Sequence, residues 1–197
     1  MCLVIGTVRA EPVDGAADEL LQRLQGLQQL QGRFKQRQYD ETGKLLLESS
    51  GRFKLLRPGF FSWEIREPDR QLLIADEQYL WHFDRELETV TRRPVSGRAE
   101  MSPLQVLGGD EQVLRDSFAI VAVDADSFRL QPRDIDPGFS ELLLKLDDDG
   151  LQGMEILDKL NQRVVISFDQ LDASTGLTPE DFAFTPPEGA DIFYYDE

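Results

Sequence analysis

The sequence is poor in the residue types that most reactive sites require. Among its 197 residues there is one cysteine, Cys2, and one histidine, His82. A single cysteine excludes an intramolecular disulfide, a CxxC pair and a thiolate metal site, and a single histidine excludes a two-histidine metal site. No run of 18 apolar residues occurs, so no segment is predicted to span a membrane as a helix.

Basic residues are outnumbered as well. The chain has 21 Lys and Arg against 37 Asp and Glu, which gives a formal net charge of −16. Nucleic acid and anionic membrane surfaces repel a protein of this charge at long range. We therefore expect no nucleic-acid partner and a well-solvated acidic protein.

The common catalytic motifs are missing too. The patterns GxGxxG, GxxxxGK[ST], GxSxG and HExxH do not occur. The acidic groups Asp124/Asp126, Asp134/Asp136 and Asp147–Asp149 lack the spacing of a calcium-binding loop, which favours solvated loop carboxylates. His82 has no visible partner, which favours a hydrogen-bonded strand histidine over a general base. We expect no enzymatic activity, no cofactor and no metal site.

The first residues form a short apolar run, Cys2 to Val8, which ends in Val8-Arg9-Ala10. Small residues at such spacing are what a signal peptidase recognises. We expect residues 1–12 to be the remnant of a secretory signal or a disordered terminus, and residues 13–197 to be a single domain.

Hydrophobic spacing predicts a helix followed by strands. Leucines at 20, 21, 24, 27 and 30 form one helical stripe that ends before Gly32. The spacing then changes to two, with short turn-like links typical of antiparallel neighbours. Short helices are expected in "AEMSPLQVL", with Ser102 as N-cap, and in "GDEQVLRD". The expected strands, about eleven in one meander, are 34–39, 45–56, 60–65, 71–75, 79–84, 87–92, 118–123, 127–132, 140–146, 151–158 and 162–169.

Each strand has one apolar side and one mixed side. In "FFSWEI", Phe61 and Trp63 share a face, and in "YLWHF", Tyr79, Trp81 and Phe83 share one. The predicted helices provide little cover for so large an apolar surface. The sheet is therefore either curled into a closed barrel or left as an incomplete barrel with an apolar hollow, and a fully packed core is the remaining alternative.

Four segments in order resemble the family of periplasmic outer-membrane lipoprotein carriers, the LolA family. They are "RPGFFSW" (57–63), "PDRQLLIADEQYLWHFDRELETV" (68–90), "MSPLQVL" (101–107) and "FAFTPPEGAD" (182–191). The resemblance implies a mainly β fold with a few helices. A single antiparallel sheet of about eleven strands would curl into an unclosed barrel, with helices as a lid over an apolar cavity.

The same resemblance implies a function. The protein would be a monomeric periplasmic carrier that binds the acyl chains of lipoproteins. It would take them from an inner-membrane ABC-type lipoprotein-releasing complex and deliver them to an outer-membrane receptor lipoprotein. The alternative is a periplasmic sensor or regulatory module of the same half-barrel fold that binds a lipid or a partner protein.

The resemblance also implies which residues do the work. Arg57 would bond to the lid helices. Phe61, Trp63 and Trp81 would line the cavity, and Leu104, Val106 and Leu107 would face it from the lid. Gln105 departs from the family because this lid position is commonly apolar.

Overall fold

The computed structural model describes residues 14–95, 103–133 and 137–195, apart from the side chains of Asp14, Leu104 and Gln105. The expected signal remnant (1–12), the N-cap Ser102 and the pair Asp134/Asp136 lie outside the described residues. The helices are α1 (Asp14–Gln25), α2 (Pro103–Gly108), α3 (Glu111–Ser117) and the 3-10 turn η2 (Pro179–Phe182). Within these ranges no helix is long and apolar enough to cross a bilayer.

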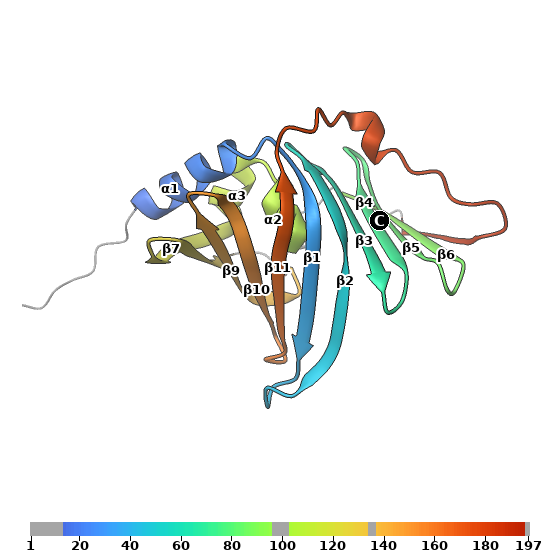
Figure 1. Cartoon of the computed structure of the whole chain (residues 1–197), viewed down its shortest axis with the longest axis horizontal. Helices are drawn as coiled ribbons and strands as arrows, with labels where there is room; N and C mark the ends of the chain where they lie inside the picture. The colour runs from blue at the N-terminus through green and yellow to red at the C-terminus, as the bar shows by residue number, and fades with distance from the viewer. Residues whose placement is uncertain (1–13, 96–102, 134–136, 196–197) are drawn as a thin grey trace, which may run out of the picture.

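The strands form one curved sheet that does not close into a barrel (Figure 1). The fold class inferred from the sequence is confirmed, with twelve strands in place of about eleven. The strands are β1 (Gln29–Tyr39), β2 (Leu45–Leu56), β3 (Phe60–Glu67), β4 (Gln71–Ala75), β5 (Tyr79–Asp84), β6 (Thr89–Pro94), β7 (Phe118–Asp124), β8 (Ser127–Pro132), β9 (Phe139–Asp147), β10 (Gly150–Asp158), β11 (Arg163–Asp172) and β12 (Asp191–Tyr194).

The strand order differs from a simple meander. It runs β12-β6-β5-β4-β3-β2-β1-β11-β10-β9-β8-β7, so β1 pairs with β11 and the consecutive strands β6 and β7 lie far apart. Helices α2 and α3 come between β6 and β7 in the chain. The twelfth strand was not predicted, and it pairs with β6 in parallel, which makes the sheet mixed.

The first helix is shorter than its leucine stripe predicts. It ends at Gln25, and Leu30 belongs to β1, where it pairs with Leu55. Leu20, Leu21 and Leu24 are completely or almost completely buried on the helix. The row of leucines extends beyond the helix because Leu30, on the following strand, is buried in the same core as the helix leucines.

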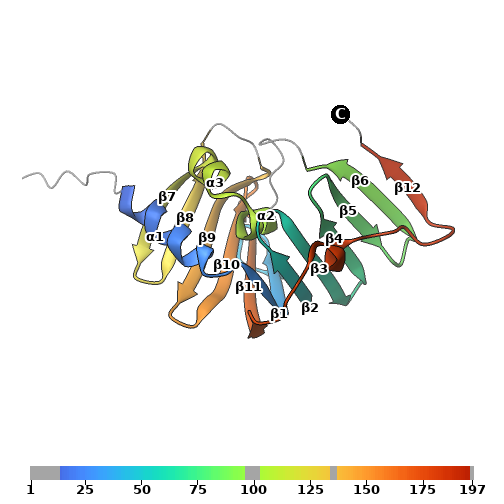
Figure 2. The ribbon, with the colours of Figure 1, turned by 90° about the horizontal axis from the view of Figure 1, so that it is seen from above.

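Two apolar clusters lie on opposite faces of the sheet. The main core fills the concave face and includes residues of α1, α2 and α3, and Figure 2 shows α2 and α3 inside the curve of the sheet. A smaller cluster lies on the outer face and joins Phe60 and Ile74 to Phe182 of η2. The segment after β11 thus covers part of the outer face before it supplies β12.

Candidate functional site

The floor of the candidate site is aromatic and belongs to the central strands. Phe61 and Trp63 of β3 point to the concave face and are 3% and 4% exposed. Trp63 stacks on Phe34 of β1, with ring centroids 3.7 Å apart and planes 19° apart, and lies edge-on to Phe168 of β11 at 6.2 Å. Aromatic rings bury a large apolar area per residue, so this floor is strongly hydrophobic.

A glycine makes this stacking possible. Gly51 of β2 pairs with Phe34, and a Cβ at this position would lie 2.7 Å from the Phe34 ring and 1.9 Å from the carbonyl oxygen of Glu64. Neither distance is compatible with a side chain. The central strands can therefore approach closely and place the Phe34 ring over Trp63.

The lid over this floor is α2. Val106 and Leu107 are 0% and 4% exposed and belong to the same core as Phe61 and Trp63. The turn before β3 holds the end of this helix, since the N–H of Gly59 donates to the carbonyl of Gly108 at 2.7 Å. Gly59 has a φ of +90°, a conformation that favours glycine. The side chain of Leu104, also expected on the lid, lies outside the described residues.

Arg57 joins the sheet to the lid. Its guanidinium donates to the carbonyl oxygens of Leu107 at 3.1 Å and Gly109 at 2.6 Å. These carbonyls lie at the C-terminal end of α2, where the last carbonyl groups of a helix have no N–H donor within the helix and where a cation is favoured. Burial lowers the pKa of Arg57, while the carboxylates of Glu111 and Asp110 raise it. The arginine is thus partly withdrawn from water and still bound to the lid.

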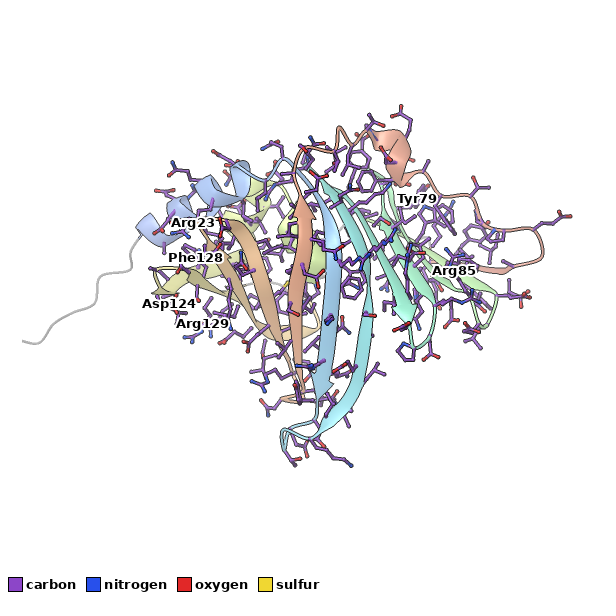
Figure 3. The ribbon with its side chains drawn as sticks, viewed as in Figure 1. Arg23, Tyr79, Arg85, Asp124, Phe128 and Arg129 are labelled. Carbon is purple, nitrogen blue, oxygen red and sulfur yellow. The ribbon has the colours of Figure 1, made fainter. Side chains whose placement is uncertain are left out.

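The neighbouring helix α1 is fastened to the opposite half of the sheet. Arg23 donates to the carbonyl of Leu146 at 2.7 Å and to that of Ala125 at 2.9 Å. Its guanidinium also lies over the Phe128 ring at 5.4 Å (Figure 3). α1 therefore has several direct links to strands and turns around β8 and β9, whereas the link from Arg57 reaches α2 across the mouth of the sheet.

The described residues leave little free space between the floor and the lid. The void between floor and lid measures about 10 Å³, and most of its lining is apolar, including Leu55, Phe61, Trp63 and Leu107. This is the size of a single water molecule, so the aromatic floor and the lid pack together. Larger hollows of about 320 and 560 Å³ occur on the outer face, but their shared lining of Arg33, Arg52, Arg66 and Gln170 is polar and does not suit acyl chains.

Trp81 does not belong to this floor. In the β3–β4–β5 ladder Trp81 pairs with Ile74, which pairs with Ser62, so these three residues share the outer face. Trp81 contacts Phe184 at 5.5 Å between ring centroids and packs in the outer cluster. The prediction that Trp81 shares a lining with Phe61 and Trp63 is therefore wrong. Both faces of β5 are apolar because the C-terminal segment covers the outer one.

Several residues of the floor were missed by the sequence reasoning. Phe34, Phe53 and Phe168 surround Trp63, with Phe53 at 6.0 Å between ring centroids. A signal was available in β2, where Phe53 and Leu55 alternate with Arg52 and Lys54. Similarly, Phe34 alternates with Arg33 and Lys35 on β1.

The fold and the site together define a class of protein. It is an open half-barrel whose concave apolar face is covered by short helices. The chain also matches the family model "Outer membrane lipoprotein carrier protein LolA" over residues 25–185. This chain belongs to that family, as its motifs indicate.

Proteins named outer-membrane lipoprotein carrier protein are similar over nearly the whole chain. The one from Alkalilimnicola ehrlichii is 34% identical and the alignment covers 98% of this chain and 90% of the relative. The one from Chromohalobacter salexigens is 31% identical, with 96% and 94% covered, and the one from Halorhodospira halophila is 33% identical, with 100% and 92% covered. These names connect the family with lipoprotein transport by a carrier.

Solved structures share the fold at low sequence identity. A putative outer membrane lipoprotein-sorting protein domain from Vibrio parahaemolyticus has a TM-score of 0.55 at 13% identity, covering 85% of this chain and 94% of that one. A LolA superfamily protein from Nitrosomonas europaea has a TM-score of 0.52 at 11% identity, covering 86% and 98%. At this identity the likeness concerns the fold alone.

Proposed function

We propose that this protein carries lipoproteins through the periplasm by holding their acyl chains between the concave face of the sheet and α2. The lipoproteins would come from an inner-membrane ABC-type releasing complex and go to an outer-membrane receptor lipoprotein. The observation that supports this most is the aromatic floor of Phe61 and Trp63 under a short helix that is hydrogen-bonded to Arg57 in the β2–β3 turn.

The closed site is compatible with binding only if the lid moves. Acyl chains need a volume far larger than the void of about 10 Å³. Displacing α2 would expose Phe61, Trp63 and the inner side of the helix as one apolar surface. Each methylene group removed from water there contributes about 0.8 kcal/mol, so two or three acyl chains supply enough free energy to hold the lid open.

The contacts that hold the lid closed would oppose this binding. The two hydrogen bonds from Arg57, the hydrogen bond from Gly59 and the packing of Val106 and Leu107 exist when the lid is shut. Cargo must disrupt these contacts, and they re-form when cargo leaves. The sequence contains no nucleotide-binding motif, so loading would depend on energy supplied by the donor complex, and discharge would run downhill to the acceptor.

The test is release of lipoproteins from membranes. Purified protein is added to spheroplasts, and the supernatant is analysed for a soluble complex of carrier and acylated lipoprotein by mass spectrometry. Phe61→Glu should reduce the yield of this complex by at least about tenfold, because an unpaired carboxylate would face apolar cargo. Phe61→Met keeps the site apolar and should load normally.

Leu87→Glu serves as the matched control, because Leu87 is 72% exposed and lies away from the floor. Circular dichroism and thermal unfolding verify that each variant is folded. The proposal is wrong if the native protein forms no soluble complex, or if a folded Phe61→Glu protein loads as well as the Leu87→Glu control.

A further inference from the structure

Four leucines at one end of the sheet are exposed to solvent. Leu45, Leu46 and Leu47 at the start of β2 are 47%, 50% and 41% exposed, and Leu160 in the β10–β11 turn is 67% exposed. The two hairpin ends are neighbours, because Tyr39 of β1 pairs with Leu45 on one side and with Arg163 on the other. Figure 1 shows them together at the lower end of the sheet. We call these four leucines the leucine tip.

A β-bulge distributes the leucines over both faces of the hairpin. Leu47 pairs with Gln38 and Leu45 pairs with Tyr39, which leaves Leu46 as the extra residue. Residues paired across a ladder share a face, and successive residues of a strand point to opposite faces. Leu45 and Leu47 therefore point to opposite sides, although residues two apart on a regular strand would share one.

The exposure does not arise from a loose loop. The carboxylate of Asp40 accepts hydrogen bonds from the backbone N–H groups of Thr42 and Lys44, both at 2.9 Å, and from the Thr42 hydroxyl at 2.7 Å. Gly43 supplies the positive φ, +83°, that the turn requires. The tip is thus ordered before it meets any partner, so binding would sacrifice little conformational freedom.

The charges around the leucine tip balance, unlike those of the chain as a whole. Residues 37–48 and 158–163 contain four cations and four carboxylates, and their net charge is zero in a chain of −16. The cations and the carboxylates are Arg37, Lys44, Lys159, Arg163, Asp40, Glu41, Glu48 and Asp158. The tip can therefore approach a surface that repels the rest of the molecule.

We propose that the leucine tip inserts into the interfacial layer of a zwitterionic phospholipid bilayer and brings the protein to the membrane with this end first. A groove on a folded protein covers one face of a hairpin, whereas a lipid layer surrounds a hairpin end on all sides, which suits leucines on both faces. Tyr39, whose ring lies 5.1 Å from the Arg163 guanidinium, adds an amphipathic aromatic group of the kind that membrane interfaces favour. This inference does not depend on the proposed binding of acyl chains.

Flotation with phospholipid vesicles tests the proposal. The native protein should float with phosphatidylcholine vesicles, and adding anionic lipid should weaken binding at low salt because the acidic body is repelled. Replacing the three consecutive leucines, L45S/L46S/L47S, should lower the partition coefficient by at least about tenfold. The matched control L87S/V121S/V123S removes three exposed apolar side chains elsewhere and should bind as the native protein does.

A second measurement covers the case in which the triple variant does not fold. In a Cys2→Ser background, an environment-sensitive dye at L46C should shift to the blue with vesicles, while the same dye at L87C should not. Failure of the native protein to float, or equal loss of binding in both triple variants, would overturn the proposal. So would vesicle-independent self-association that is lost in L45S/L46S/L47S, because the tip would then bind a second copy of the chain.

Discussion

In the proposed carrier, the guanidinium of Arg57 would favour the shut state of the lid, because its two hydrogen bonds to the end of α2 would be lost when the lid opens. Each hydrogen bond from a charged donor to a carbonyl contributes roughly 1.5–3 kcal/mol, and Arg57 makes two. Arg57→Leu removes them, so the population shifts towards the open, loaded form. The variant should accept lipoprotein and transfer it to the acceptor at least about tenfold more slowly.

Loading and transfer must be measured separately, by release from spheroplasts and by delivery to acceptor-bearing membranes. Arg57→Lys keeps the positive charge but lacks the planar guanidinium that donates to two carbonyls at once. Its transfer rate should lie between that of the native protein and that of Arg57→Leu. A variant that loads poorly but transfers its cargo at the native rate would show instead that Arg57 serves loading or folding.

Helix α2 is the element that must move if the site is to open. Its last residue, Gly108, lies against β2, and a Cβ at this position would be 3.0 Å from the Leu55 side chain. A disulfide formed by L55C and G108C in a Cys2→Ser background should hold α2 to the sheet. The oxidised protein should lose lipoprotein uptake, and reductant should restore it.

The reduced form of the same protein is the matched control, since both forms carry identical substitutions. An apolar fluorescent dye that binds the native protein should likewise be excluded by the oxidised form. Normal uptake by a fully oxidised protein would mean that α2 does not control access to the apolar floor.

The excess of carboxylates over basic groups causes strong electrostatic repulsion within the whole molecule. Its net charge is −16, and the ion pairs among its described residues, such as Arg37–Glu48 at 2.7 Å, are mostly exposed. Exposed pairs contribute little, whereas repulsion among many like charges destabilises the compact state. Raising the NaCl concentration from low to about 0.5 M should therefore raise the unfolding temperature by several degrees.

Sodium sulfate is a poor choice for this test because it also strengthens apolar burial. With NaCl, a fall in the unfolding temperature would indicate that attractive ion pairs outweigh the repulsion. Neutralising acidic positions in the turns, as in Asp148→Asn and Asp149→Asn, should raise the unfolding temperature at low salt and leave a smaller salt dependence.

The sequence by itself determined most elements and the apolar character of the site. Strands β2, β4, β5 and β8 have the predicted bounds, because a period of two depends on local alternation and local turn residues. The motifs also placed Arg57 at the lid and Phe61 with Trp63 on the apolar face. These are relations among residues close in sequence or within one familiar pattern.

Tertiary structure alone decided which strands pair and which face each apolar row occupies. Alternation assigns side chains to two sides within a strand, but the ladder register decides which side becomes concave, and it placed Trp81 on the outer face. The pairing of β1 with β11 and the parallel pairing of β12 with β6 join residues far apart in the chain. Such contacts depend on the combined burial of several elements, so no local pattern specifies them.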